Sequence, residues 1–259
     1  SQESVFGEVS EVVQSALDGY SVCLMSYGQT GSGKTHTMQG SGDGPMRGII
    51  PRAMQQVGTY KSALEQKGWH YTMQVTFVEI YNETIRDLLR TSSPADSSAA
   101  PPKHDIKKDA SGATYVTDVR RVEVDPNDSA QVNSIMELAS RQRSVTATAM
   151  NEQSSRSHSI FCLHLQASHR DQGVTLKGNL SLVDLAGSER LDRSMATGAA
   201  AKEAMAINKS LSSLKDVFVA IGNKAGHVPF RNSKLTYLLQ PALSGDGKTL
   251  MMVNLSPTQ

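Results

Sequence analysis

Residues 21–35 read SVCLMSYGQTGSGKT, and this stretch decides the fold. Its first seven residues are mostly apolar and show no helical period, which predicts a buried strand. The strand continues into Gly28-x-x-x-x-Gly33-Lys34-Thr35, the phosphate-loop pattern. Glycines let the backbone curl until successive N–H groups face an anion, and the helix expected from Lys34 onward adds the positive end of its dipole. The Lys34 ammonium can reach the β- and γ-phosphates, and the Thr35 hydroxyl can ligate Mg²⁺.

Two other interpretations of this glycine-rich stretch are weaker. The first is a simple glycine-rich turn before a helix, but the strand–loop–helix setting favours a phosphate loop. A dinucleotide-binding fingerprint is excluded because its glycine spacing is different.

Hydrophobic periodicity predicts helices alternating with strands around this stretch. Helices are expected at residues 5–17, 49–64, 130–147, 195–221 and 233–243. Strands are expected at residues 21–27, 71–81, 159–167, 175–184 and 249–255, with a weak hairpin over 105–124. This alternation predicts an α/β domain of three layers, with a central, mostly parallel sheet and helices on both faces.

Composition limits the class of protein. The chain has 259 residues, with 26 basic and 25 acidic side chains, so a polycation that binds nucleic acid non-specifically is not expected. No apolar run is long enough to span a membrane, and the first residues lack the pattern of a signal peptide. Cys23 and Cys162 lie far apart in apolar segments, which favours two thiols in a reducing compartment over a disulfide or a metal site. Residues 91–103, rich in Ser, Ala and Pro, are predicted to form a loop within one domain that spans residues 1–259.

Two further segments fit a nucleotide hydrolase. Residues 180–184, LSLVD, are an apolar strand that ends in Asp184, a carboxylate suited to Mg²⁺, although a strand-terminal Asp is often only a turn former. The next residues, LAGSE, place Gly187 where its N–H could meet a γ-phosphate. Residues 151–158, NEQSSRSH, form either a solvated loop with a helix cap or a loop that senses the γ-phosphate.

Together these segments resemble the motor head of the kinesins. The phosphate loop, residues 151–158 and residues 184–189 look like its nucleotide loop and its two switch loops. Further matching segments follow in the family's order: residues 79–83 (EIYNE), 87–89 (DLL), 207–211 (INKSL) and 227–236 (HVPFRNSKLT). Residues 17–20 (LDGY) and the Trp69-x-Tyr71 pair look most like the C-terminal-motor class, which moves toward microtubule minus ends.

The resemblance implies roles for particular residues. Thr35 would ligate Mg²⁺ directly, Asp184 through water, and Ser155 would contact the ion as well. Ser154 and Ser155 would contact the γ-phosphate or the attacking water, with Gly187 beside them. Arg156 and Glu189 would form an ion pair that closes the switch loops and relays a proton. The implied nucleotide contacts are Gly28, Gln29, Thr30, Gly31, Ser32, Gly33, Lys34, Thr35, His36 and Asn151.

The resemblance also implies partners and a location. Lys209, Lys215, Arg231 and Lys234 would form a basic patch for the acidic microtubule, although so few cations are ordinarily just a solvated face. ATP, Mg²⁺ and microtubules are therefore the expected ligands, in the cytoplasm and on the cytoskeleton, including the spindle. No nucleic acid or membrane span is expected, and the full-length protein is expected to dimerise through a coiled coil outside this sequence.

The sequence departs from the family pattern at its ends. The family's first strand and last helix have no counterpart, which predicts weak nucleotide binding and aggregation because sheet edges are left unpaired. One alternative is therefore a kinesin-derived module that binds microtubules without nucleotide turnover. Another is a GTPase-like switch, which is disfavoured because residues 223–226, NKAG, lack the acid that would recognise guanine.

Overall fold

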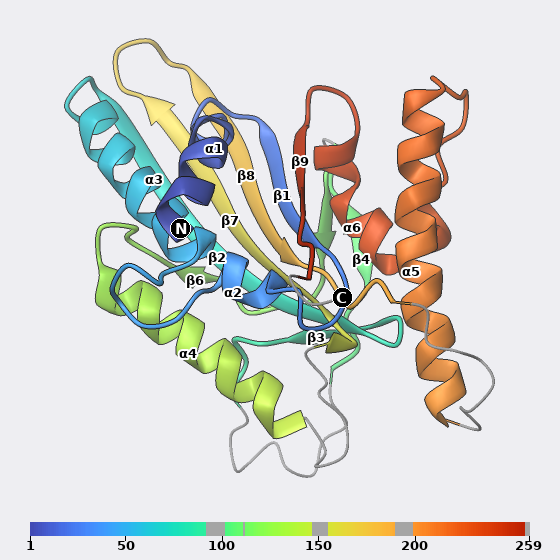
Figure 1. The fold of residues 1–259 in the computed structure, drawn as a ribbon. Helices are drawn as coiled ribbons and strands as arrows, with labels where there is room; N and C mark the ends of the chain where they lie inside the picture. Colours follow the sequence, from blue (N-terminus) through green and yellow to red (C-terminus); the bar gives the residue numbers. More distant parts are fainter. Residues whose placement is uncertain (92–101, 111, 147–154, 190–198, 257–259) are drawn as a thin grey trace.

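A computed structural model describes residues 1–91, 102–110, 112–146, 155–189 and 199–256 of the chain. Its centre is a seven-stranded sheet with the order β3-β2-β7-β8-β1-β9, in which β6 also pairs with β2 (Figure 1). The strands are β1 (Ser21–Tyr27), β2 (Trp69–Tyr81), β3 (Thr84–Asp87), β6 (Val122–Glu123), β7 (His158–His169), β8 (Thr175–Asp184) and β9 (Lys248–Val253). A separate hairpin joins β4 (Ile106–Lys108) to β5 (Thr114–Val116).

The expectation of a mostly parallel sheet is wrong, because the sheet is mixed. Among the strands of the described residues, only β8, β1 and β9 run parallel to one another, whereas β3, β2, β6, β7 and β8 pair antiparallel. The reason lies in the short link between β7 and β8, where His169 N donates to Val174 O at 2.9 Å. A parallel connection needs about a dozen residues or more, so two strands joined by such a tight turn must form a hairpin.

Helices cover both faces of the sheet, so the predicted three-layer α/β architecture is confirmed (Figure 1). One face carries α1 (Gln2–Gln14), α3 (Ile49–Glu65) and α4 (Ser129–Thr146). The other carries α5 (Ala199–Gly222), the short 3-10 helix η3 (Phe230–Asn232), α6 (Lys234–Leu243) and the β4–β5 hairpin. The short helix α2 (Lys34–Met38) follows the phosphate loop. None of the helices in the described ranges combines the length and apolar character needed to cross a bilayer.

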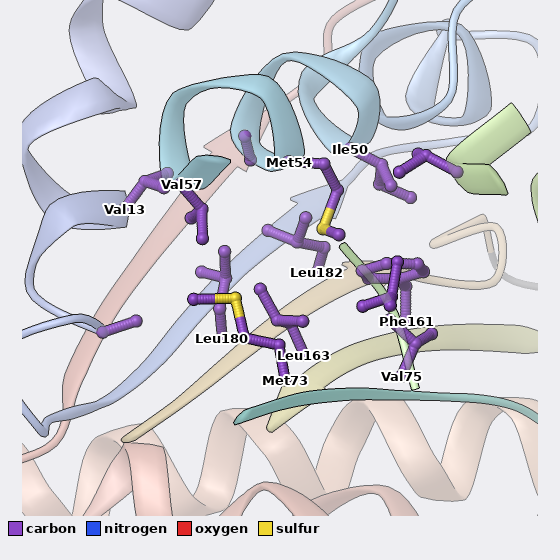
Figure 2. Packing of buried hydrophobic residues seen from close by; sticks show 14 of the residues in the cluster. Val13, Ile50, Met54, Val57, Met73, Val75, Phe161, Leu163, Leu180 and Leu182 are labelled. Carbon is purple, nitrogen blue, oxygen red and sulfur yellow. The ribbon is translucent and has the colours of Figure 1, made fainter. Parts of the chain in front are cut away.

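Two apolar cores follow from the alternation of side chains along the strands. Met73, Val75 and Phe77 of β2 point toward α1, α3 and α4, whereas Val78 and Ile80 point toward α5 and α6. Figure 2 shows how the first core closes, with helix side chains such as Met54 and Val57 resting on strand side chains such as Leu180 and Leu182. The strand predicted at residues 71–81 is therefore central and buried on both faces.

One strand was not predicted from the sequence. β3 returns along β2 after a two-residue turn in which Asn82 and Glu83 both have positive φ, 49° and 55°. This is the backbone of a tight hairpin turn, which favours Asn-Gly, and the Glu at the second position hides the signal. Most of the loop predicted at 91–103 lies outside the described residues. The hairpin predicted over 105–124 is confirmed for β4 and β5, but its last residues form β6 and pair with β2.

Phe161 provides a test of the first core. Its ring meets Phe77 edge to face with centroids 5.5 Å apart, and both side chains are 1 % exposed. Phe161→Ala should lower the free energy of unfolding by about 3–5 kcal/mol, because the cavity cannot collapse fully. The matched control is Val219→Ala on α5, which is 52 % exposed and should change stability by less than about 0.5 kcal/mol. Urea denaturation of the two variants measures the difference, and equal losses would contradict this assignment of the core.

Candidate functional site

The phosphate loop lies where the parallel strands end. β1 and β8 pair in register, so Ser26 stands opposite Asp184 and both strands finish at the same edge. Gly28 packs tightly there, since an added Cβ would collide with the Asn254 carbonyl and lie 2.6 Å from Ser32 Oγ. Asn254 N donates to Tyr27 O at 2.7 Å, and Ser188 N donates to Gly28 O at 3.0 Å. Only glycine fits between Ser32 and the residue that follows β9 (Lys248–Val253), and the start of the loop is thereby held in place.

The loop curls back on itself in the way its glycines predict. Gly31 and Gly33 have φ of 79° and 91°, a conformation that L side chains rarely adopt. The Lys34 ammonium donates to the Gln29 carbonyl at 2.9 Å across the loop, and Ser32 Oγ donates to the same oxygen at 2.8 Å. Residues 28–35 thus form one continuous cradle. His36 follows at its rim with an exposed side chain, while its carbonyl accepts from Gln2.

Thr35 and Asp184 are brought together as a hard-oxygen pair. Thr35 Oγ1 donates to Asp184 Oδ2 at 2.6 Å, and Asp184 is only 3 % exposed. Burial raises the pKa of Asp184, and the Thr35 hydrogen bond and the nearby Arg143 and Lys34 oppose that rise. One hydroxyl and one carboxylate beside an anion cradle match the way proteins hold Mg²⁺ together with nucleotide phosphates. These residues therefore fit the predicted ion.

Lys34 sits at the bottom of the cradle and is 7 % exposed. Burial lowers the pKa of its ammonium, while Asp184 and Glu189 act against that shift. A buried ammonium whose hydrogen bond goes to a backbone carbonyl can exchange that contact for a phosphate oxygen.

Glu189 occupies the mouth of the cradle. Its carboxylate accepts a hydrogen bond from Thr30 N at 2.8 Å and a second from Thr30 Oγ1. Burial would raise the pKa of Glu189, but the hydrogen bonds from Thr30 outweigh it and hold the pKa below its ordinary value. A carboxylate on the loop's N–H shows that the loop accepts an anion in this conformation.

The ion pair expected between Arg156 and Glu189 is not formed in this structure. Arg156 Nη1 instead contacts Glu203 Oε2 of α5 at 2.9 Å. Gly187 still joins the two switch segments, because its N–H donates to the Ser155 carbonyl at 2.8 Å. A Cβ at Gly187 would meet the Glu189 carboxylate and Thr30 Oγ1, so a side chain there would displace the hydrogen bonds between these two residues. Asn151 and Ser154 lie outside the described residues.

His158 was not predicted as a site residue, yet it connects the site to α5. Its Nδ1 accepts from Ala186 N at 3.0 Å, so the proton lies on Nε2, which reaches Ser210 Oγ at 2.8 Å. Burial, with Lys34 nearby, lowers the pKa of His158 to about 3. The ring is therefore a neutral bridge between the second switch segment and α5. Its signals in the sequence were its place at the end of the NEQSSRSH segment and at the start of an otherwise apolar strand.

A second unpredicted group surrounds Glu79, a β2 carboxylate that is 1 % exposed. Ser157 Oγ donates to Glu79 Oε1 at 2.7 Å, and Arg143 Nε lies 3.5 Å from the same oxygen. Arg143 Nη1 also lies 3.8 Å from Asp184. This group ties α4 and β7 to the carboxylate at the site. Glu79 was signalled in the sequence as a charge within an apolar strand and as part of the EIYNE segment, whereas Arg143 lies in the polar stretch 140–144 and carried no such signal.

The four residues expected at a microtubule surface differ in their exposure to solvent. Lys209 and Lys215 are exposed on α5, and Arg231 is exposed in η3 with its guanidinium 5.4 Å from the Tyr237 ring. Lys234 is partly buried, and its ammonium contacts the His104 carbonyl at 3.5 Å. Lys209, Lys215 and Arg231 are therefore free to meet a partner, whereas Lys234 mainly anchors the segment that precedes β4.

Comparison with known proteins identifies the family. The chain matches the kinesin motor domain over residues 1–259. It is a kinesin motor domain.

Related kinesins agree with this assignment. The chain is 54 % identical to "Kinesin-like protein KIN-14M" of Arabidopsis thaliana over 261 residues, which cover 99 % of the chain and 35 % of that protein. It is 49 % identical to "Carboxy-terminal kinesin 2" of Xenopus laevis, over 100 % of the chain and 40 % of that protein. The chain thus spans little more than a third of the length of these relatives. This confirms the resemblance to the C-terminal class.

The motor-domain structure of the Saccharomyces cerevisiae kinesin-related protein KAR3 superposes with a TM-score of 0.85. The two sequences are 46 % identical, and the match covers 99 % of this chain and 75 % of that one. The kinesin fold is therefore shown by both sequence and structure.

The neutral state of His158 predicts a pH dependence of the kinesin domain's stability. Its pKa is depressed on folding, so below about pH 6.5 the unfolded chain binds a proton that the folded chain does not. This term therefore lowers the free energy of unfolding as the pH falls, by at most about 1.4 kcal/mol per pH unit. We expect His158→Gln to be less stable at neutral pH but to lose stability less steeply between about pH 6 and pH 4. Urea denaturation across that range measures both slopes, and parallel slopes would contradict a neutral, buried imidazole.

Proposed function

We propose that this kinesin domain hydrolyses ATP in a reaction stimulated by microtubules and drives movement along them. The observation that carries the proposal is the joining of Lys34, Thr35 and Asp184 at one sheet edge with two glycine-linked switch segments. The likeness to C-terminal kinesins supports extending the proposal to movement toward microtubule minus ends.

The residues divide the chemistry among them. Phosphoryl transfer to water depends on positioning and on neutralising charge more than on covalent catalysis. The N–H groups of residues 28–35 would hold the β- and γ-phosphates, and Lys34 would neutralise them. Thr35, Asp184 and Ser155 would hold Mg²⁺, which supplies further neutralisation of the phosphates. Ser154, Asn151 and the Gly187 N–H would complete the contacts to nucleotide and water.

Arg156 has two possible carboxylate partners, and this suggests a switch. In the structure it binds Glu203 of α5, while Glu189 covers the phosphate loop through Thr30. A γ-phosphate on the loop would compete with Glu189 for Thr30 N and release its carboxylate. Pairing of Arg156 with Glu189 would then close the pocket and position a water, and hydrolysis would reverse the exchange.

The same exchange of partners would affect α5, the helix that carries two of the lysines proposed to bind the microtubule. Glu203 and Ser210 both lie on α5, which also carries the exposed Lys209 and Lys215. Losing the Arg156 contact frees the start of α5, while His158 keeps its middle joined to the second switch segment. Nucleotide state would thereby change the presentation of the basic side chains to the acidic microtubule.

ATP turnover by the chain, with and without polymerised microtubules, tests the proposed function. We expect stimulated turnover that Lys34→Ala abolishes, because the phosphates lose their buried cation. The matched control is Lys224→Ala, a change in the turn after α5 that should leave turnover within about twofold. Microtubule co-sedimentation without turnover would replace the motor proposal with a nucleotide-impaired binding module.

Glu203→Gln tests the switch separately. The substitution removes the competing partner of Arg156 and should raise turnover without microtubules by about threefold to tenfold, equivalent to about 1 kcal/mol. Glu189→Gln should instead lower turnover by at least about tenfold, because the closed pair cannot form. Steady-state assays on both variants, with folding checked by circular dichroism, distinguish the two effects. A Glu203→Gln variant that is folded yet slower than the parent would refute the exchange.

A further inference from the structure

Cys162 belongs to a polar cluster on the sheet face opposite α1 and α3. Its Sγ lies 3.9 Å from His164 Nδ1, and Ser181 Oγ of the neighbouring strand donates to Sγ at 3.6 Å. His164 is held by two more partners, Asn179 Oδ1 at 2.9 Å and Thr76 Oγ1 at 3.0 Å. The Nδ1–H can be shared between Asn179 Oδ1 and the Cys162 sulfur, and the Nε2–H can go to Thr76 Oγ1, so the geometry suits an imidazolium beside a thiolate.

The cluster opens into a cavity of about 430 Å³ between the sheet, the β4–β5 hairpin and α6. Cys162, His164 and Ser181 form part of its wall, and Cys162 is partly exposed. The nucleotide site is elsewhere, because the cavity reaches Ser21 at the start of β1 whereas the phosphate loop begins where β1 ends.

The charged groups around the cavity favour an anion. Two exposed cations, Arg121 and Lys177, and one carboxylate, Asp109, line it together with His164 and Tyr115. The Asp109 carboxylate accepts a hydrogen bond from Ala113 N at 3.0 Å within its own loop. With two cations and one carboxylate held within its own loop, the lining of the cavity has a net positive charge.

Cys23 provides an internal comparison. It is fully buried in apolar surroundings, and burial raises the pKa of its thiol far above the ordinary value. Burial also acts to raise the pKa of the Cys162 thiol, but His164 and the Ser181 hydroxyl outweigh this effect, so the pKa is lowered. The pKa of His164 is raised in turn, since Cys162 offsets the effect of burial on the imidazole. The two cysteines should therefore differ greatly in reactivity.

The sheet register prevents these thiols from pairing with each other. Ser181 of β8 stands opposite both Cys23 of β1 and Cys162 of β7, so the cysteines are two strands apart. Two strand spacings amount to about 9–10 Å, beyond the roughly 7 Å between Cα atoms that a disulfide allows. An oxidising partner of Cys162 must therefore come from outside the chain.

We propose that Cys162 is a covalent modification site that undergoes thiol–disulfide exchange with small disulfides that carry carboxylates. The Cys162 thiolate attacks one sulfur of the disulfide, a new S–S bond forms, and the old S–S bond breaks. The departing half leaves as a thiolate, so the disulfide is the oxidant and no further reactant is needed. His164 stabilises the attacking thiolate, and Arg121 and Lys177 attract the carboxylates of the incoming molecule.

The probe is 5,5′-dithiobis(2-nitrobenzoate), a small aromatic disulfide with two carboxylates whose released thiolate is coloured. Native protein should show one fast thiol, and peptide mass mapping should place the adduct on Cys162. Cys23→Ala should keep the fast phase, and Cys162→Ser should remove it. An adduct first found on Cys23, or no thiol reacting faster in native than in unfolded protein, would overturn the proposal. Mapping uses the unaltered chain, so it holds even if Cys162→Ser fails to fold.

His164→Gln tests the thiolate itself. At about pH 6.5 an ordinary thiol is only about 1 % ionised, so the variant should react at least about tenfold more slowly than the parent. Near pH 9 the two rates should converge to within about threefold, because hydroxide then ionises the thiol in both. A loss that is equal at both pH values would show that His164 only shapes the cavity and would refute its role.

Arg121→Gln together with Lys177→Gln tests the preference for anions. The anionic probe should slow by about threefold or more, whereas the neutral disulfide 2,2′-dithiodipyridine should keep its rate. Equal slowing of both probes would contradict the predicted charge selectivity. None of these residues belongs to the nucleotide site, so the outcome is independent of the proposed motor activity.

Discussion

The parallel, in-register pairing of β1 with β8 is the constraint on which the rest of the site depends. It brings the origin of the phosphate loop beside Asp184 and lets Thr35 donate to a carboxylate 149 residues away. Because Gly28 leaves no room for a side chain between Ser32 and Asn254, this edge tolerates little displacement. A misplaced register would separate the cation, the hydroxyl and the carboxylate that nucleotide chemistry needs together.

Buried polar groups connect this edge of the sheet to the helices that pack on both of its faces. His158 joins the second switch segment to α5, and Glu79 with Arg143 joins α4 to the strand that bears Asp184. Such groups cost free energy to bury unless every partner is in place, so they keep the connected elements in a definite arrangement. The proposed exchange of Arg156 between two carboxylates is the part of the site that can rearrange, and it lies where a phosphate would bind. The fold thus combines a fixed platform with one set of contacts that can change.

The two faces of the sheet differ in what they bury. The α1, α3 and α4 face is closed by apolar side chains, whereas part of the α6 face keeps Thr76, Cys162, His164 and Ser181 around a cavity. Period-2 alternation places both patterns on the same strands, since neighbouring residues point to opposite faces. The reactive thiol that we propose follows from this polar half of β7 and from nothing in the nucleotide site.

The sequence by itself determined the α/β class, the phosphate loop, the acid at the end of β8 and the family, because these depend on local patterns. Glycine spacing, apolar periodicity and the NEQSSRSH and DLAGSE segments are each readable within a few residues. Only the tertiary structure decided the mixed sheet, since strand direction depends on pairing between distant segments, although the short β7–β8 link could have indicated a hairpin. It also decided which carboxylate Arg156 meets, that Lys234 is partly buried, and that His158, Glu79 and Arg143 join the site. These depend on which side chains folding brings within hydrogen-bonding distance, and residues such as Arg156 and Glu203, 47 positions apart, leave no local pattern that pairs them.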